Sequence, residues 1–161
     1  MATPVVKEAR PRLHCKKPQC REGLPILTPI PDINPALPGR PIHEAGGMLF
    51  QNNPLSLVCS LVCNHEAQCE GHCVLGKKGQ PVHISSIENY VSSNYFDKLR
   101  SCPAKPNGMR AAIIGSGPAG ITIAILLAQR GYGVTIFEGK DKIGGVLRYG
   151  IPDFRLPKTI L

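Results

Sequence analysis

The sequence predicts an α+β chain in two parts, an irregular and helical part over residues 1–107 and the start of a parallel α/β part over residues 108–161. Nine of the 16 prolines lie in residues 1–41, and four of the seven cysteines lie in residues 59–73. A strand, a glycine-rich turn, a helix and a second strand follow one another from residue 110. These three observations carry the prediction.

In the first part, the prolines lack amide donors and restrict the residues before them, so residues 1–41 are predicted to be irregular or extended. Apolar residues at helical spacing predict a short helix over residues 41–52, and a second apolar stretch covers residues 55–63. A third helix is predicted over about residues 86–100, with one buried stripe made of Ile87, Val91, Tyr95 and Leu99.

A linker rich in turn-forming residues, 101–108, separates the two parts. After it we expect a buried strand over 110–114, a glycine turn over 115–120, a buried helix ending at Gly131, and a second strand over 134–138. This order predicts a β-α-β unit with parallel strands.

The glycine turn has the form Gly-x-Gly-x-x-Gly, and Glu138 ends the next strand. Gly115 permits a tight turn, Gly117 lets backbone approach a pyrophosphate, and Gly120 lets helix and strand pack closely. Glu138 would accept hydrogen bonds from an adenosine ribose. The pattern predicts a dinucleotide site of the Rossmann type, although FAD and NAD share it; a plain turn with a surface carboxylate is the alternative.

The net charge of +8 is compatible with nucleic acid, an acidic partner or negatively charged cofactors. The basic residues near the N-terminus lack interleaved aromatic residues, so we expect no nucleic-acid binding. No signal-peptide pattern is present, and glycines and a proline interrupt the longest uncharged run, 111–129. We therefore expect no membrane span, reduced thiols and a cytoplasmic location.

The cysteine cluster has the spacing Cys59-x3-Cys63-x5-Cys69-x3-Cys73, and the spacing within each pair would place two sulfurs on one helix face. Thiolates this dense favour an iron-sulfur centre, with a zinc site or unmetallated thiols as alternatives.

Cys15 and Cys20 would need further ligands from elsewhere. Ser85 and Glu88 have the spacing of a capping box, so on spacing alone Glu88 is expected to cap a helix. The remaining candidates are predicted to be solvated or hydrogen-bonded histidines and a free thiol, namely His65, His72 and Cys102.

In combination, four segments resemble the N-terminal part of the glutamate synthase small (beta) subunit family, whose relatives include the N-terminal region of dihydropyrimidine dehydrogenase and NAD(P)-dependent ferredoxin oxidoreductases. These segments are residues 15–20, 53–76, 115–120 and 144–158, and together they extend from Cys15 almost to the end of the chain.

The resemblance implies an α-helical ferredoxin-like domain with two [4Fe-4S] clusters, followed by an FAD-binding Rossmann domain and a later NAD(P)H domain. Electrons would pass from NAD(P)H through FAD to the clusters, and on to a partner such as a glutamate synthase large subunit or a ferredoxin-like domain. The FAD-binding residues would be Gly115, Ser116, Gly117, Pro118, Ala119, Gly120, Glu138, Gly145 and Leu147. The metal ligands would be Cys59, Cys63, Cys69 and Cys73, with Cys15, Cys20 and Glu88 as further candidates.

The sequence departs from the relatives at two ligand positions. One cluster would use the places of Arg12, Cys15, Cys20 and Cys73, and the other those of Leu24, Cys63, Cys69 and Glu88. Arg12 and Leu24 stand where the relatives have cysteines, so each set lacks one thiolate. Cys59, which those relatives leave unligated, is available to fill a gap; the alternative is a cluster that has three ligands and is labile. We therefore expect one [4Fe-4S] centre and leave the second open.

The second part is too short for a complete doubly wound domain and has no second glycine fingerprint for NAD(P)H. We expect an N-terminal fragment of an oxidoreductase that cannot oxidise a nicotinamide alone. The alternative is a non-catalytic zinc-binding or interaction module with a vestigial dinucleotide fold.

Overall fold

The computed structural model describes residues 5, 15–34, 41–97 and 104–161. The chain divides into two compact units, residues 1–99 and residues 100–161. The first contains helices and irregular chain, and the second contains two parallel strands with helices, which confirms the predicted fold class. The sequence-based expectations for Arg12, Leu99 and Cys102 lie outside the described residues.

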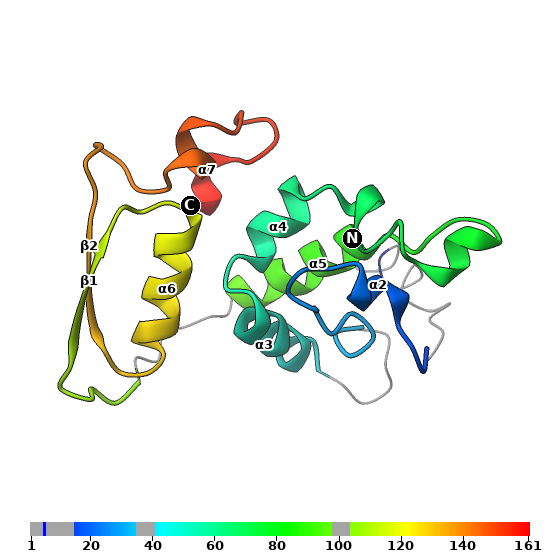
Figure 1. Ribbon diagram of the computed structural model, residues 1–161, viewed down its shortest axis with the longest axis horizontal. Coiled ribbons are helices and arrows are strands. Elements are labelled where there is room, and N and C mark those ends of the chain that lie inside the picture. The colour runs from blue at the N-terminus through cyan, green and yellow to red at the C-terminus, as the bar shows by residue number, and fades with distance from the viewer. Residues whose placement is uncertain (1–4, 6–14, 35–40, 98–103) are drawn as a thin grey trace. The chain divides into compact units, whose positions relative to one another are not determined.

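The first unit is built around the packing of α3 and α4 on α5 (Figure 1). Its helices are α2 (Gln19–Glu22), α3 (Ile42–Asn52), α4 (Ser56–Val62), η1 (His65–Ala67), η2 (Val74–Lys77) and α5 (Ile84–Phe96). The fully buried apolar side chains at its centre include Ile33, Leu49 and Val91. Ile30 and Ile33 reach this core from the irregular segment before α3, so the proline-rich chain packs there without forming long helices.

Helix α3 confirms the predicted helix over residues 41–52, with Pro41 at its start. Gly46 lies against α5, because a Cβ atom there would be 2.4 Å from Cβ of Tyr95. A glycine at this position therefore lets the two helices approach closely. Phe50 continues the contact, with its ring centroid 5.7 Å from that of Tyr95.

The capping box predicted for Ser85 and Glu88 is wrong. Helix α5 begins at Ile84, two residues before the predicted start, so Ser85 lies inside the first turn. Its backbone N–H and its hydroxyl both donate to Oε1 of Glu70 at 2.8 Å. Glu88 is only 7% exposed and lies on the buried side of the helix. A carboxylate from a distant segment therefore caps α5 in place of one from the helix itself.

Replacing Glu70 with alanine is expected to lower the free energy of unfolding of the first unit by about 1–3 kcal/mol, because two donors of Ser85 lose their acceptor. Urea titration followed by circular dichroism measures the change. The control is Glu66→Ala, since Glu66 is exposed. Equal stability of the two variants would contradict the capping role.

The second unit contains β1 (Arg110–Ile114), α6 (Pro118–Ala128), β2 (Gly133–Phe137), α7 (Val146–Tyr149) and η3 (Lys158–Ile160). The strands are parallel, with Arg110 opposite Gly133 and Ile114 opposite Phe137. The predicted β-α-β unit is therefore confirmed.

The prediction that the strands and α6 are buried is wrong. Ile114 is 84% exposed and Phe137 is 56% exposed, and in α6 only Ala124 is buried. Helix α6 lies along the two-stranded sheet (Figure 1). Every second residue of each strand is exposed. These residues lie on the sheet face opposite α6, which the described residues of this unit leave uncovered. Doubly wound sheets have both faces covered, and their strands are apolar for that reason.

In the described ranges, no helix combines the length and the apolar character that crossing a membrane would require.

Candidate functional site

A cavity of about 240 Å³ in the first unit collects most of the predicted metal ligands. We call it the sulfur cavity. Its lining residues are Leu24, Pro25, Ile26, Thr28, Asn53, Cys59, Cys63, His65, Gln68, Cys69 and Glu88. All four places that the resemblance assigns to one cluster are therefore in this lining, with Leu24 among them.

Polar contacts between α4 and α5 set the position of the cysteines on α4 relative to Glu88. The hydroxyl of Ser92 donates to Ser56 Oγ at 3.0 Å, and both side chains are buried. One turn further along, the amide of Asn89 donates to Ser60 Oγ at 3.1 Å. These hydrogen bonds join α4 to α5 next to the cavity that Cys59, Cys63 and Glu88 line together.

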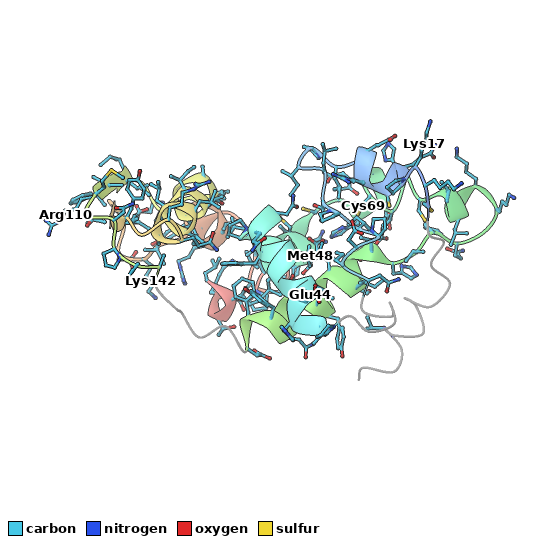
Figure 2. The ribbon with its side chains drawn as sticks, turned by 90° about the horizontal axis from the view of Figure 1, so that it is seen from below. Lys17, Glu44, Met48, Cys69, Arg110 and Lys142 are labelled. Carbon is cyan, nitrogen blue, oxygen red and sulfur yellow. The ribbon has the colours of Figure 1, made fainter. Side chains whose placement is uncertain are left out.

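Cys69 is held in the cavity wall by a tight turn. The carbonyl of His65 accepts the amides of Gln68 at 3.1 Å and Glu70 at 2.9 Å. A Cβ atom on Gly71 would lie 2.1 Å from the carbonyl oxygen of Glu66, so only glycine fits there. Cys69 is 1% exposed and lies inside the first unit in Figure 2, whereas Lys17 extends outward.

The expectation that both cysteine pairs share helix faces holds only for α4, which contains Cys59 and ends just before Cys63. Cys69 and Cys73 lie in the non-helical chain between η1 and η2. The Gly71 turn separates them, and Cys73 lines a different cavity. Four cysteines that are adjacent in the sequence are thus divided between two places.

The second cavity, of about 40 Å³, is the Cys15 cavity. Its three cysteines are Cys15, Cys20 and Cys73, the three thiols of the other set that the resemblance implies. The remaining lining residues are Pro18, Gln19, Ile30, Pro31, Val74, Leu75, Val82 and Ile84. The described part of the chain contains no three His, Cys, Asp or Glu side chains grouped around one metal-ion position.

Cys59 and Cys63 share a hydrogen bond, and one sulfur of the pair ionises before the other. The thiol of Cys63 donates a hydrogen bond to Cys59, and so does the amide of Asn53, which lies 3.2 Å from Cys59 Sγ. These donors lower the pKa of Cys59 to about 6, although burial acts in the opposite direction. The same hydrogen bond, together with burial, raises the pKa of Cys63. The metal-free pair therefore carries one thiolate at neutral pH.

Cys69 and Glu88, which line the same cavity, are mainly protonated at neutral pH in the metal-free protein. Burial, reinforced by the negative charges of Glu70 and Glu88, raises the pKa of Cys69 to about 12. Burial and the thiolate of Cys59 raise the pKa of Glu88 to about 8. Because metal ligands bind in their deprotonated forms, metal binding here would release protons.

The two histidines of the cysteine segment differ in their surroundings. His72 is exposed and its Nδ1 lies 2.6 Å from the carbonyl oxygen of Gln68, which confirms the expectation of a solvated, hydrogen-bonded side chain. His65 lines the sulfur cavity, with Nδ1 3.5 Å from Sγ of Cys69. It is hydrogen-bonded as expected, but its Nε2 is buried and has no hydrogen-bond partner.

The second unit builds the predicted glycine turn between β1 and α6. Gly115 has φ +91°, a left-handed conformation that favours glycine, and its N–H donates to Phe137 O at 2.7 Å. Gly117 caps the N-terminus of α6, and Pro118 begins the helix. A Cβ atom on Gly120 would lie 2.1 Å from the carbonyl oxygen of Gly115, so this glycine permits the close packing of turn and helix.

Ser116 and Glu138 join the glycine turn to the end of β2. Oε2 of Glu138 accepts the N–H of Ser116 at 2.9 Å and also its hydroxyl, while Oε1 accepts the N–H of Lys140 at 3.0 Å. These donors, the Ser116 hydroxyl first, lower the pKa of Glu138 to about 2. The carboxylate is therefore ionised at the mouth of the turn, at the strand end where the motif places it.

Ser116 also joins the turn to the next loop, a role that the glycine pattern does not reveal. It is fully buried, and the N–H of Gly144 donates to its Oγ at 3.1 Å. Gly145 has φ +52°, and a Cβ atom there would lie 2.8 Å from Cα of Gly117. The Gly144–Gly145 loop thus packs directly on the dinucleotide turn.

Lys158, the last residue of the segment 144–158, binds the end of α7, a contact that the sequence pattern does not reveal. Its Nζ donates to the carbonyl of Leu147 at 2.9 Å and to that of Ile151. Leu147 is 5% exposed within the same short segment. The ammonium group therefore satisfies carbonyls at the C-terminal end of α7, which lies next to the glycine loop.

Comparisons with known proteins agree with the division of the chain into two units. The family described as dihydropyrimidine dehydrogenase domain II, 4Fe-4S cluster, matches residues 2–99. The family described as NAD(P)-binding Rossmann-like domain matches residues 113–157. The first match covers more than half of the chain, and the second covers the end of β1, the glycine turn, α6, β2 and α7.

Similar proteins include the glutamate synthase [NADPH] small chain of Escherichia coli strain K12, which is 36% identical over 153 residues, 92% of this chain and 32% of that protein. The protein of the same name from Mycobacterium tuberculosis strain H37Rv is 37% identical over 152 residues, 92% of this chain and 31% of its own length. The NAD-dependent dihydropyrimidine dehydrogenase subunit PreT of Salmonella typhimurium strain LT2 is 32% identical over 160 residues, 97% and 38% of the two chains.

The chain spans about a third of the length of the curated relatives it matches. The expected resemblance is confirmed by both relatives and family profiles. The chain belongs to the family of dihydropyrimidine dehydrogenase domain II, 4Fe-4S cluster, and continues into the start of an NAD(P)-binding Rossmann-like domain.

Proposed function

We propose that the chain corresponds to the N-terminal part of an NAD(P)H-dependent iron-sulfur flavoprotein oxidoreductase. The observation that carries the proposal is the presence of three thiols and a carboxylate around one cavity in a 4Fe-4S family domain, followed by a dinucleotide turn. When bound, FAD and the iron-sulfur centre would exchange electrons. The functional domains are proposed to be residues 1–107 and 108–161.

The sulfur cavity fits an iron-sulfur centre through the chemistry of its donors. Thiolates are the ligands that hold such clusters, and Glu88 adds an oxygen ligand. We propose Cys63, Cys69 and Glu88 as ligands. Cys59 is proposed as the fourth ligand, because Leu24 stands where the relatives have a cysteine and its side chain cannot bind iron. The Cys15 cavity, with Cys15, Cys20 and Cys73, is the proposed place for a second centre.

The proposed dinucleotide is FAD. The N-terminus of α6 and the glycine turn would face its pyrophosphate, and Glu138 would face its ribose. Pro118 and Ala119 form the start of α6, and Gly145 lies close enough to Gly117 for both loops to border one ligand. Leu147 is proposed to lie near the flavin.

NAD(P)H would react with a further domain, and the relatives, which are about three times as long as this chain, have room for one. We therefore expect no steady NAD(P)H oxidation by the 161-residue chain alone. The relatives' names, small chain and subunit, describe parts of larger assemblies. We propose that the redox partner is another subunit or domain, resembling a glutamate synthase large subunit or a ferredoxin, in the cytoplasm.

Anaerobic reconstitution of the 161-residue chain with ferrous iron and sulfide tests the metal centre. We expect a brown protein that retains iron and sulfide after desalting and bleaches on reduction. Because two sulfur ligands are lost, the double variant Cys63→Ser, Cys69→Ser should retain at most about half of the iron.

The matched control is Cys102→Ser, because the sequence predicts a free thiol at this position. It should retain as much iron as the unmodified chain. A colourless protein that copurifies with zinc, or equal iron retention in the double variant and the control, would overturn the proposal. Titration with FAD, followed by quenching of flavin fluorescence, tests the dinucleotide separately.

A further inference from the structure

A histidine ring lies against one of the sulfurs of the sulfur cavity. His65 Nδ1 is 3.5 Å from Cys69 Sγ, which is hydrogen-bonding distance for sulfur. The other ring nitrogen, Nε2, is buried, and among the described residues it is the one buried side-chain nitrogen or oxygen without a hydrogen-bond partner. The two nitrogens of one ring therefore have opposite surroundings.

This difference assigns the proton of the ring. A neutral imidazole carries one N–H, and a buried donor without a partner costs about 1–3 kcal/mol. A proton on Nε2 would create such a donor, whereas a proton on Nδ1 has the sulfur of Cys69 as its acceptor. The hydrogen-bond network thus assigns the N–H to Nδ1 and leaves only a lone pair on Nε2.

The backbone keeps the ring in this position. His65 begins η1, and its carbonyl accepts the amides of Gln68 and Glu70 on either side of Cys69. The ring and the sulfur therefore belong to one hydrogen-bonded turn, and their contact does not depend on a mobile side chain reaching across the cavity.

We propose that His65 is a positioning residue that donates its Nδ1–H to the Cys69 thiolate and raises the reduction potential of the centre. The inference rests on the proposed function, because it requires Cys69 to be a ligand. A metal-bound thiolate has no proton and can only accept in this contact. Hydrogen bonds to the sulfurs help to set iron-sulfur potentials, and a donor favours the reduced, more negative form.

The tautomer can be measured without any metal. In the metal-free chain labelled with [15N]histidine, nuclear magnetic resonance at a pH where His65 is neutral should show a protonated Nδ1 and an unprotonated Nε2. His65→Gln identifies the signals of His65. A proton on Nε2 would overturn the donor assignment whether or not the chain binds a cluster.

The effect on the centre is measured by redox titration of the reconstituted chain. His65→Leu removes the donor and should shift the midpoint potential to more negative values, with iron and sulfide contents unchanged. His65→Gln restores a side-chain N–H and should return the potential toward that of the unmodified chain. His72→Leu is the control, because His72 is exposed and belongs to the same segment; its potential should not shift.

An unchanged potential in His65→Leu, or an equal shift in His72→Leu, would overturn the inference and leave the proposed function standing. Loss of the cluster in both His65 variants would also overturn it, because His65 would then be a ligand or a structural requirement. Failure of the unmodified chain to retain iron and sulfide would overturn the proposed function, and the role of His65 in setting a potential would fall with it.

Discussion

Gly120→Ala is expected to destabilise the second unit by about 2 kcal/mol and to abolish dinucleotide binding. The new Cβ atom would lie 2.1 Å from the carbonyl oxygen of Gly115, a backbone atom that cannot rotate away. Alanine in a helix normally gains up to about 1 kcal/mol over glycine, whereas overpacking costs about 1–3 kcal/mol or more. We expect the clash to outweigh the gain because the contact is far inside van der Waals distance.

Gly117→Ala is the informative companion variant. A Cβ atom on Gly117 meets nothing within 4 Å, and the residue has φ −65°, which alanine adopts readily. The free energy of unfolding of the variant should therefore lie within about 0.5 kcal/mol of that of the unmodified chain. It should nevertheless bind FAD at least tenfold more weakly, because the added methyl group occupies the space where backbone would approach the pyrophosphate.

Thermal and urea unfolding measure the first effect, and quenching of flavin fluorescence measures the second. Gly139→Ala provides the baseline, since a Cβ atom there also meets nothing within 4 Å. If Gly120→Ala were as stable as Gly139→Ala, the close packing of turn and helix would be wrong. If Gly117→Ala bound FAD normally, the proposed pyrophosphate position would be wrong.

Ionisation of Glu88 is expected to lower the stability of the metal-free first unit as the pH rises from about 5 to about 8, and Glu88→Gln should remove this contribution. Burial raises the pKa of Glu88 from 4.5 to about 8, the thiolate of Cys59 adding to the effect. Between these values the folded protein keeps a proton that the unfolded chain has released, so the free energy of unfolding falls with rising pH. At about 1.4 kcal/mol for each pKa unit, the contribution of Glu88 is on the order of 4 kcal/mol.

Cys59 acts in the opposite sense, because its pKa is lowered to about 6 and its thiolate stabilises the folded state at higher pH. The difference between the unmodified chain and Glu88→Gln isolates the carboxyl group, since both retain Cys59. Urea unfolding of the metal-free proteins at a series of pH values measures it. If the free energies of unfolding of the two proteins changed in parallel with pH, the pKa of Glu88 would not be raised in the folded protein.

The local elements of this chain were predictable because their signals lie within short stretches. Helix α3 follows Pro41 as the apolar spacing indicates, and β1, the glycine turn and β2 form the expected parallel unit. The position of Glu138 at the end of β2 was also predictable, because it depends only on the length of one helix and its turns.

The partners of single side chains could not be predicted in this way. Glu70 caps α5 from 15 residues away, and spacing alone assigned that role to Glu88. Ser116 accepts the amide of Gly144 across 28 residues, and nothing local to Ser116 marks this contact. Such contacts depend on which segments the fold places side by side.

The sequence by itself determined helix α3 and the parallel β-α-β unit, and it provided the candidate ligands and dinucleotide-binding residues. The family resemblance implied how the other cysteines are divided, but only the tertiary structure decided the place of Cys59. It lines one cavity with Cys63, Cys69 and Glu88, and Cys73 joins Cys15 and Cys20 at another. The physical reason is the range of the interactions. Helix periodicity and turn chemistry act over a few residues, whereas a cavity forms where distant segments fail to fill the space between them.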